Sequence, residues 1–306
     1  MKFQQLRYYV AVYEEGSFSA GAARSNATQS GLSMQIRDLE ERFGTRLFDR
    51  VPSGIVPTEA GRRFYQHAIQ VLQAAHSAEQ CLSDARDQPM GHFKVGLMPT
   101  FTRSVLPSAL LELNAKYPLI KVSVLEAYSE QLSQMTLAGE LSFSIVPATP
   151  PRDGLRISPL GTDREFLVSG KNSAIEHGKP VRLRDLGELN LILPGTRNAR
   201  RPGIERYLAA HGAQTADILE MDAMIGTIEL VARSGWMSIL PGLLCHADEA
   251  GMKRKLHPIV DPPLTVSYVR IEPSTRNLNQ AEAIFSDLLS KHMNELLEWS
   301  NSSEFT

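Results

Sequence analysis

Cysteine is scarce in this sequence of 306 residues, which contains only Cys81 and Cys245. Two cysteines without CxxC spacing supply neither a disulfide framework nor a structural zinc site, although a redox switch between the two thiols stays open. No stretch reaches the roughly 18 consecutive apolar residues that a membrane span requires, and the N-terminus lacks the apolar segment of a signal peptide. We therefore expect a cytoplasmic protein with no membrane partner.

A surplus of basic residues is also missing. The chain has 32 Lys and Arg against 34 Asp and Glu, which gives a formal net charge of -2. Proteins that bind nucleic acids usually carry a basic surplus. From Met1 to Phe64 the sequence holds Lys2 and eight Arg against seven acidic residues, so the local surplus is small. Any contact with phosphate must therefore depend on the placement of single cations, among them Arg62 and Arg63.

The sequence lacks the local motifs of enzyme chemistry. It contains no GxSxG, no HExxH and no glycine-rich phosphate loop, and its eight His stand at no recognised spacing from a Ser, Cys or carboxylate partner. We predict no enzyme activity, no catalytic residue, no metal site and no cofactor. The composition, 42% hydrophobic and 22% charged, is that of a soluble folded protein, and the length predicts two or three domains.

The stretch from Ser17 to Gly44 predicts two short helices joined by a tight turn, after a supporting helix over Phe3–Glu15. The second helix carries one apolar stripe at spacings of four, three and four residues. That stripe consists of Leu32, Ile36, Leu39 and Phe43. The opposite face presents mostly short polar side chains and one guanidinium, a combination that suits a helix lying in the major groove of DNA. An ordinary amphipathic helix with a solvated face is the alternative.

A strand, turn and strand follow this helix. Leu47–Arg50 and Ile55–Thr58 flank the turn residues Pro52-Ser53-Gly54, which predicts a small β-wing, and a long helix opens at Thr58. The segments GSF from Gly16, QSGLSMQIRDLEERFGTRLFDR from Gln29 and TEAGRRF from Thr58 resemble the LysR family of bacterial transcriptional regulators in order and spacing. The resemblance implies a winged helix-turn-helix that binds double-stranded DNA, with RNA polymerase as a further partner. We predict DNA contacts from Gln29, Ser30, Ser33, Met34, Arg37, Arg50 and Arg62.

The long helix, expected over residues 58–88, carries a narrow heptad seam of small and apolar residues. Its members are Phe64, Ala68, Val71, Ala75, Ala78, Leu82 and Ala85. Such a seam needs a partner, and we predict that it pairs two copies of the chain, as the linker helix of the resembled family does. A homodimer or homotetramer would then read the two half-sites of an inverted repeat. Burial of the seam against the chain's own second domain is the alternative.

Strands alternate with helices after residue 89, which predicts an α/β fold with parallel strands. We expect strands at 93–97, 122–126, 141–146, 165–168, 189–193, 218–221, 236–240 and 264–270, and helices at 106–117, 131–138, 202–211, 225–234 and 278–297. The resemblance implies a two-lobed effector-binding domain like the periplasmic binding proteins, in which the chain crosses twice between lobes. The predicted domains are 1–57 (winged helix-turn-helix), 58–88 (linker) and 89–301 (effector domain), with lobe I at about 92–164 and 266–301 and lobe II at about 165–265.

Three segments after strands offer hydroxyl groups and free backbone N–H groups where ligands bind in open α/β lobes. The predicted effector site consists of Pro99, Thr100, Phe101, Thr102, Thr196, Arg197, Gly226 and Thr227. With Arg103 and Arg197 nearby, these residues suit a small carboxylate or another small anion. Helix capping by the threonines is the alternative, and the resemblance adds that the matching positions of the family line a cleft. We expect Arg200 and Arg201 to be surface charges. Ser142 stands where the family commonly has an acidic residue.

Together these observations predict a ligand-responsive, DNA-binding transcriptional regulator. The rival interpretation is a cytosolic α/β solute-binding or enzymatic domain with an N-terminal protein-interaction module. The wing argues against that rival, because it directly follows the second helix of the Ser17–Gly44 stretch, the helix that we expect to read DNA (the reading helix).

Overall fold

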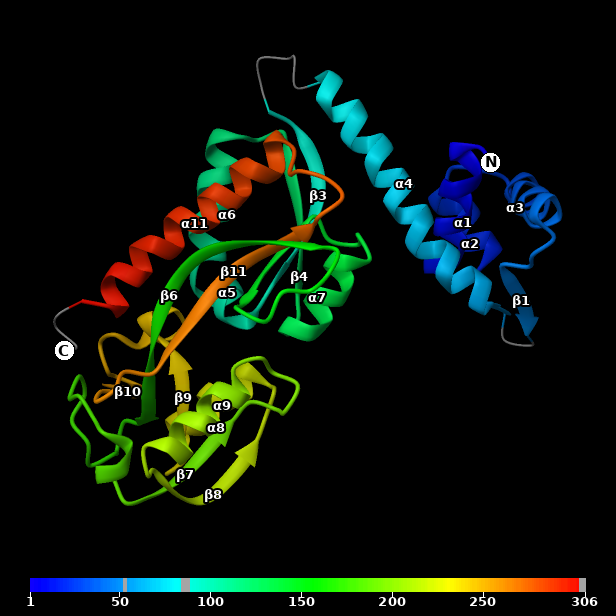
Figure 1. Ribbon diagram of the computed structural model, residues 1–306. Coiled ribbons are helices and arrows are strands. Elements are labelled where there is room, and N and C mark those ends of the chain that lie inside the picture. The colour runs from blue at the N-terminus through cyan, green and yellow to red at the C-terminus, as the bar shows by residue number, and fades with distance from the viewer. Residues whose placement is uncertain (52–53, 84–88, 303–306) are drawn as a thin grey trace. The chain divides into compact units, whose positions relative to one another are not determined.

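The computed structural model describes residues 1–51, 54–83 and 89–302. These residues form two compact units, an N-terminal unit that ends with a long helix and a C-terminal α/β unit (Figure 1). Each unit is described by itself below. Among the described residues, no helix combines the length and the apolar character that crossing a membrane requires.

The N-terminal unit contains the predicted helices and wing. Its elements are α1 (Phe3–Glu15), α2 (Phe18–Arg24), α3 (Gln29–Phe43), β1 (Phe48–Val51), β2 (Gly54–Pro57) and α4 (Glu59–Ser83). Local chemistry sets the boundaries, because the hydroxyl groups of Ser17 and Thr28 accept backbone N–H groups at the starts of α2 and α3. Gly16 and Gly44 end α1 and α3 with φ of 62° and 61°, in the left-handed region that glycine adopts most easily.

The core of the N-terminal unit lies between α1, α3 and the wing. Leu32, Ile36 and Leu39 are at most 2% exposed, as the stripe on α3 predicts. The prediction that Phe43 is buried with them was wrong. Phe43 is 60% exposed because α3 ends at this residue and the chain turns away at Gly44.

Helix α4 contributes the first part of its seam to this same core. Ala68 is fully buried there, and Phe64 packs against the core with Tyr65, Ile69 and Leu72. Further along α4, Val71 and Ala78 are exposed. The side chain of Leu82 and the end of the predicted linker at residues 84–88 lie outside the described residues.

The backbone at Leu47 is where the wing meets the long helix. The carbonyl oxygen of Leu47 accepts the N–H of Thr58 at 3.0 Å. Gly61 passes so close to this carbonyl that a Cβ on Gly61 would lie 2.2 Å from the Leu47 oxygen. Only glycine therefore fits here without displacing the wing.

The C-terminal unit consists of two lobes joined by two long strands. Lobe I contains β3 (Gly91–Leu97), α5 (Pro99–Ser104), α6 (Leu106–Lys116), β4 (Ile120–Glu126), α7 (Ser129–Leu137) and β5 (Phe143–Pro147). Strand β6 (Leu155–Gly170) leads to lobe II, which contains η1 (Leu183–Asp185), β7 (Glu188–Leu193), α8 (Arg201–Ala210), β8 (Gln214–Glu220), α9 (Met224–Arg233), β9 (Met237–Pro241), α10 (Gly242–Cys245), η2 (His246–Asp248) and β10 (Arg254–Pro258). The chain returns to lobe I through β11 (Thr265–Pro273) and α11 (Gln280–Ser300).

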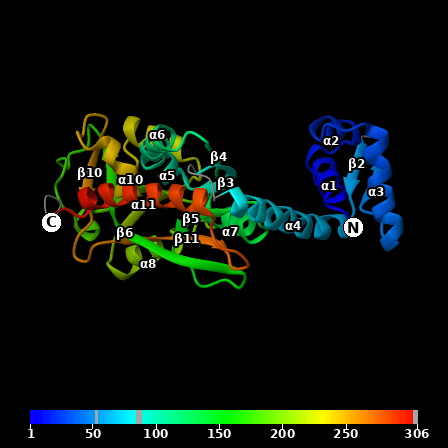
Figure 2. The same ribbon diagram turned by 90° about the horizontal axis from the view of Figure 1, so that it is seen from above.

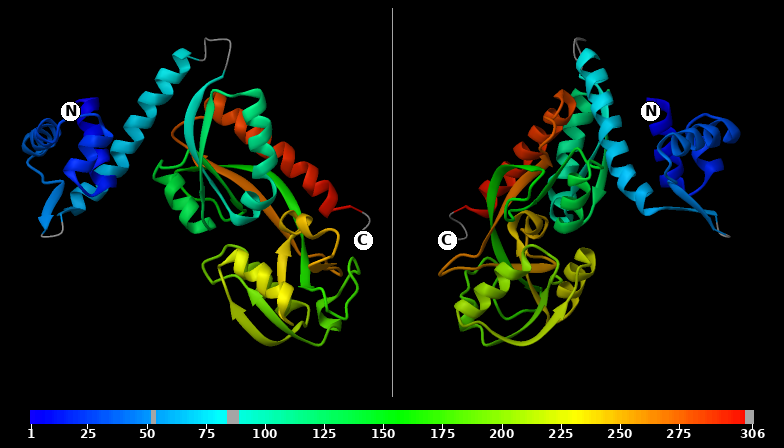
Figure 3. Two further views of the ribbon diagram at one scale, coloured as in Figure 1. Left: turned by 180° about the vertical axis from the view of Figure 1, so that it is seen from behind. Right: turned by 45° about the vertical axis from the view of Figure 1, so that its right-hand side comes forward.

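The strand order is β4-β3-β5-β11-β6-β9-β7-β8, with β10 beside β6. Parallel pairing holds within each lobe, where β3 lies between β4 and β5 and β7 lies between β8 and β9. Strands β6 and β11 are antiparallel to each other and to their other neighbours, so the prediction of parallel strands holds only inside the lobes. The predicted strand at 165–168 is only the far end of β6, which has 16 residues. Figures 1 and 3 show β6 and β11 running side by side between the lobes, which is the double crossover that the family resemblance implied.

Helix α10 joins the two hydrophobic cores. It follows β9 of lobe II, yet Leu243 belongs to the core of lobe I, where it lies among residues of β3, α5 and α11. Leu244 and Cys245 belong instead to a core cluster of lobe II. Figure 2 shows α11 extending along lobe I beside α10 and α6. A single turn of helix thus packs into both lobes.

Replacing Gly61 with Ala should destabilise the N-terminal unit by about 1–3 kcal/mol, the usual range for forcing atoms into a packed site. The reason is the 2.2 Å approach of the new Cβ to the Leu47 carbonyl. The matched control is Gly203→Ala in α8, where no atom lies within 4 Å of the new Cβ and where Ala favours a helix. Chemical unfolding followed by circular dichroism measures both, and equal stabilities of the two variants would contradict the prediction.

Candidate DNA-binding surface and interlobe cleft

The outer face of α3 is free to meet a ligand. Gln29, Ser30, Met34 and Arg37 are exposed, and Ser33 is half-buried. Among the described residues, the Arg37 guanidinium has no hydrogen-bond or ion-pair partner. The face that the sequence predicts to touch DNA therefore carries one uncommitted cation and several small polar groups.

The two other predicted DNA-contacting residues lie near the wing. Arg62 donates a hydrogen bond from Nη1 to the Pro57 carbonyl at 2.8 Å and pairs with Glu59 at 3.0 Å, with its side chain 55% exposed. These contacts fix its guanidinium at the end of β2. The side chain of Arg50 lies outside the described residues.

A small cavity lies between the two lobes. Its volume is about 20 Å³, which is room for about one water molecule. Tyr128 lines it from lobe I, and Asn198, Arg200, Thr227 and Ser238 line it from lobe II. Close by, the Ser129 hydroxyl of lobe I accepts the Ala199 N–H of lobe II at 3.3 Å. The lobes therefore touch here.

The predicted effector residues do not all line this cavity. Thr227 does, and it is 5% exposed, whereas Gly226, Thr196 and Arg197 are exposed. The Arg197 guanidinium has no hydrogen-bond or ion-pair partner in the described part of the chain.

The lobe I members of the predicted site sit deeper. Pro99, Thr100 and Phe101 are buried, and the Phe101 ring packs edge-on against Tyr268 with centroids 5.0 Å apart. The Thr102 hydroxyl donates to the Glu126 carboxylate and also lies 3.2 Å from the Pro99 carbonyl. None of these four residues lines the small cavity. Ser142, in place of the family's acidic residue, is buried and donates its N–H to the Lys94 carbonyl at 2.8 Å.

A buried ion pair behind the cavity was missed by sequence reasoning. Arg200 donates from Nε to Oε1 of Glu165 at 3.0 Å and from Nη2 to Oε2 at 2.7 Å, and Nη2 also lies 2.9 Å from the Ile239 carbonyl. Burial lowers the pKa of Arg200, but the charge and hydrogen bonds of Glu165 more than offset it, so that pKa is raised. The expectation of surface charges was wrong: Arg200 is 6% exposed and Arg201 is 7% exposed. Arg201 donates to the Pro194 carbonyl and pairs with Glu205.

A second buried carboxylate stands on the same face of β6. Asp163 is 0% exposed and accepts the Leu243 N–H at 2.8 Å and the Ser300 hydroxyl at 2.7 Å. It thereby ties β6 to the start of α10 and the end of α11. Burial raises the pKa of Asp163 to about 7, helped by the nearby Glu165 carboxylate and opposed by its two hydrogen bonds and by Arg200. The hydroxyl group of Tyr268 is buried beside Thr100, and burial and the Asp163 charge raise its pKa well above the usual value.

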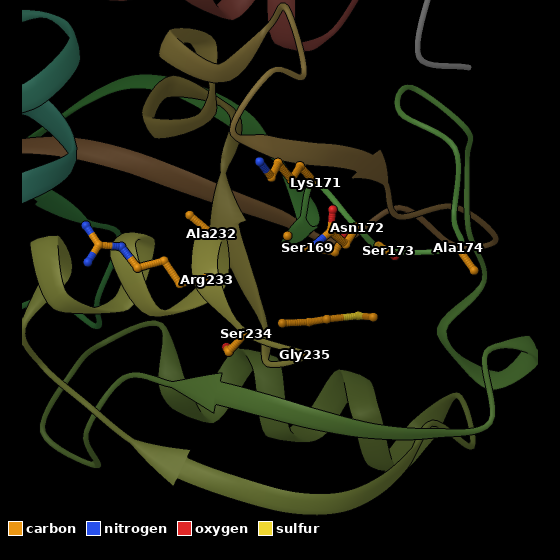
Figure 4. A pocket seen from close by; sticks show the side chains of 11 residues that line it. Ser169, Lys171, Asn172, Ser173, Ala174, Ala232, Arg233, Ser234 and Gly235 are labelled. Carbon is orange, nitrogen blue, oxygen red and sulfur yellow. The ribbon is translucent and has the colours of Figure 1, made fainter.

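A wider cavity of about 740 Å³ opens in lobe II at the ends of β6 and α9 (Figure 4). Lys171, Asn172 and Ser173 line one side and Ser234 lines another, while the Arg233 side chain extends away from these residues and pairs with Glu229. At its edge, the Ser169 hydroxyl lies 2.8 Å from Nε2 of His257. Both side chains are at most 1% exposed, and burial lowers the pKa of His257 to about 4, so this pair packs the interior. No cluster of three His, Cys, Asp or Glu suited to a metal ion occurs within the described ranges.

Comparisons with known proteins cover both units. Residues 3–62 match the bacterial regulatory helix-turn-helix protein, lysR family, and residues 86–294 match the LysR substrate binding domain. The chain is 26% identical to the nitrogen assimilation regulatory protein nac of Klebsiella aerogenes over 296 residues, which is 95% of each chain. Its fold is similar to that of full-length OxyR from Pseudomonas aeruginosa (TM-score 0.77, 18% identity, 96% of this chain and 95% of that one). It is also similar to that of CbnR in complex with its target DNA (TM-score 0.65, 23% identity, 95% of this chain and 100% of that one).

Replacing Asp163 with Asn should remove a pH dependence from the stability of the C-terminal unit. Burial keeps the Asp163 proton bound up to a pKa of about 7 in the folded protein, whereas an unfolded Asp releases it near its usual pKa of 3.8. The group therefore favours folding fully below pH 3.8, and this contribution is lost as the pH rises to about 7. At about 1.4 kcal/mol per unit, the loss is up to about 4 kcal/mol.

The measurement is chemical unfolding of the wild type and Asp163→Asn at several pH values between 4 and 8. All other titrating groups are shared, so the difference between the two curves isolates Asp163. The stability of the variant should rise relative to the wild type across this range. Parallel curves would show that Asp163 titrates as it does in the unfolded chain.

Proposed function

The chain belongs to the LysR family of bacterial transcriptional regulators, so it is a DNA-binding regulator with an effector-binding domain, and we propose the following mode of action. It binds an inverted-repeat operator as a homodimer or homotetramer and responds to a small anionic metabolite held between the lobes. Family membership confirms the prediction that the protein is not an enzyme and sets aside the rival interpretation. The observation that carries the proposal is the exposed polar face of α3 beside a wing, with an Arg37 that has no partner among the described residues.

The proposed division of labour follows the predicted domains. Residues 1–57 read DNA, residues 58–88 link and pair the chains, and residues 89–301 bind the effector, with lobe I at about 92–164 and 266–301. A regulator that binds chromosomal DNA works in the cytoplasm of a bacterium, where RNA polymerase is available as its further partner.

On DNA, α3 is the element that enters the major groove. Gln29, Ser30, Ser33, Met34 and Arg37 face base edges, and Arg37 suits the two acceptors of a guanine. Arg50 and Arg62 contact phosphates on either side of the wing and orient the helix. The bond from Arg62 to the Pro57 carbonyl supports this role, because it holds the guanidinium at the wing's end.

Two exposed apolar regions support self-association. The exposed part of the α4 seam, at Val71 and Ala78, is available to a second copy of the linker. On the C-terminal unit, Leu111 of α6 is 73% exposed and Ile225 of α9 is 77% exposed. Isolated apolar side chains on a surface are ordinary, but leucine and isoleucine this exposed at two sites suit contact with another protomer.

The effector is proposed to bind where lobe II offers Thr196, Arg197, Gly226 and Thr227 and lobe I offers the segment from Pro99 to Thr102. Arg197 supplies a cation without a partner in the described part of the chain, and charge-assisted hydrogen bonds are about twice as strong as neutral ones. Because Thr100 and Thr227 are buried while the lobes touch, a ligand that contacts both favours a more open arrangement of the lobes. A ligand shifts such an equilibrium only by its difference in affinity for the two arrangements.

Replacing Arg37 with Ala should weaken binding to the preferred DNA site by about 1–3 kcal/mol, the usual value of a bidentate base contact. Duplexes selected by the wild-type protein from a random pool, and a scrambled duplex of equal length, provide the two substrates. Binding to the scrambled duplex should change much less. The control is Arg42→Ala in the last turn of the same helix, which removes the same charge. Equal losses on both duplexes would leave only phosphate contact for Arg37.

Replacing Thr227 or Thr100 with Val should weaken effector binding roughly tenfold or more, since each removes one hydroxyl that can bond an anion and such a bond contributes about 1.5–3 kcal/mol. A thermal-shift screen of small carboxylic acids identifies the ligand, and calorimetric titration measures its affinity. Thr215→Val, on the exposed strand β8, is the matched control. Unchanged affinity in Thr100→Val would restrict the site to lobe II, and unchanged affinity in both variants would refute it.

A further inference from the structure

One carboxylate on the reading helix holds the start of the wing. Oε1 of Glu40, on α3, accepts the backbone N–H of Leu47 at 2.7 Å and that of Phe48 at 3.3 Å. These two residues lead into β1, and their side chains are buried. Without Glu40 both N–H groups would be left in a largely buried position with no partner, which is unfavourable.

The same short segment is held from the other side by the beginning of α4. The Leu47 carbonyl accepts the Thr58 N–H at 3.0 Å, and the Thr58 hydroxyl donates to the Arg46 carbonyl at 2.8 Å. Among the described residues, Glu40 makes the only side-chain hydrogen bonds from α3 to residues 46–58. The wing is thus fixed to α4 by Thr58 and to α3 by Glu40.

The contact between α3 and the wing contains a hollow. A cavity of about 70 Å³ lies between them, lined in part by Glu40, Phe48 and Ile55. Ser33 and Arg37, two residues proposed to face bases, line the same cavity. Leu47 and Phe48 pack into the same core as Ile36 and Leu39, which keeps the wing attached, but the hollow leaves room for the rest of the wing to tilt relative to α3 if the hydrogen bonds to Glu40 are absent.

The charge of Glu40 opposes the function of this surface. A carboxylate near a DNA-binding face repels phosphates, so its contribution to binding cannot be direct attraction. What it supplies is position, since sites that must hold a fixed geometry depend on supporting hydrogen bonds of this kind.

We propose that Glu40 is a positioning residue that sets the wing against the reading helix and thereby determines how well the protein distinguishes its own site from other DNA. This inference rests on the proposed contact of α3 and the wing with DNA. Phosphate contacts from the wing fix the register of α3, and base contacts then specify the sequence. A wing free to tilt would no longer fix the register of α3 on the bases, while the protein would keep most of its attraction to the phosphates of any DNA.

The test compares Glu40→Ala and Glu40→Gln in the full chain. Both hydrogen bonds use one oxygen, Oε1, so the amide oxygen of Gln can accept them, whereas Ala cannot. Glu41→Ala is the charge-matched control, because Glu41 is the next residue, is exposed and has no side-chain hydrogen bond within the described ranges. Affinities are measured on the selected duplexes and on the scrambled duplex, together with the melting temperature of each variant.

We expect Glu40→Ala to lose at least tenfold affinity for the selected duplex and less than threefold for the scrambled one, and we expect Glu40→Gln to retain the wild-type ratio. A loss that is equal on both duplexes, or a ratio that Gln fails to restore, would overturn the proposal. If the Ala variant does not fold, Glu40→Asp replaces it, since the shorter carboxylate cannot reach both N–H groups; Asp equal to Gln would overturn the proposal. Because Arg37→Ala tests base contact separately, a null result at Glu40 with a loss at Arg37 leaves the proposed function standing.

Discussion

The pairing of β6 with β11 is the constraint on which the C-terminal unit depends. The two strands pair from Arg164 beside Thr265 to Leu155 beside Pro273, with one irregularity at Tyr268. Because both strands pass from one lobe to the other, lobe I is built from two separate segments of chain, and lobe II from the continuous segment between them. Lobe I therefore needs α11, and lobe II sits between two strands that also belong to its neighbour. Any change in the angle between the lobes must bend this pair of strands.

The charged groups on β6 lie where that bending would occur. Asp163 and Glu165 point to the same side of the strand, since side chains two residues apart share a face. Glu165 pairs with Arg200 of lobe II, and Asp163 binds α10 and α11, which pack into lobe I. A buried ion pair contributes little net stability, but removing one partner is unfavourable. These groups therefore restrict which arrangements of the lobes are allowed.

Sequence reasoning located the elements whose signals are local. The stripe on α3 is such a signal, because its residues lie within a few positions of one another, and Leu32, Ile36 and Leu39 are buried as predicted. The predicted burial of Phe43 was wrong because the spacing of apolar residues does not show where a helix extends beyond the core. The short strand β10 was missed because Arg254, Lys255 and His257 do not read as a strand, although His257 is buried against Ser169. Burial of Arg200 could not be predicted either, because its partner Glu165 stands 35 residues away along the chain.

A similar hydrogen-bonding arrangement connects neighbouring elements within each of the two units. In each, one carboxylate accepts backbone N–H from a neighbouring element: Glu40 from Leu47 and Phe48 at the start of the wing, and Asp163 from Leu243 in α10. The difference lies in burial, since Glu40 is half-buried and Asp163 is fully enclosed. Burial raises the pKa of Asp163 to about 7, so this side chain in the C-terminal unit can lose or gain a charge near neutral pH. Because the Glu165 carboxylate and the Arg200 guanidinium lie beside it, that change of charge acts directly on the ion pair between β6 and lobe II. A change in the charge of Asp163 would therefore act where β6 meets α10, α11 and the Glu165–Arg200 ion pair of lobe II.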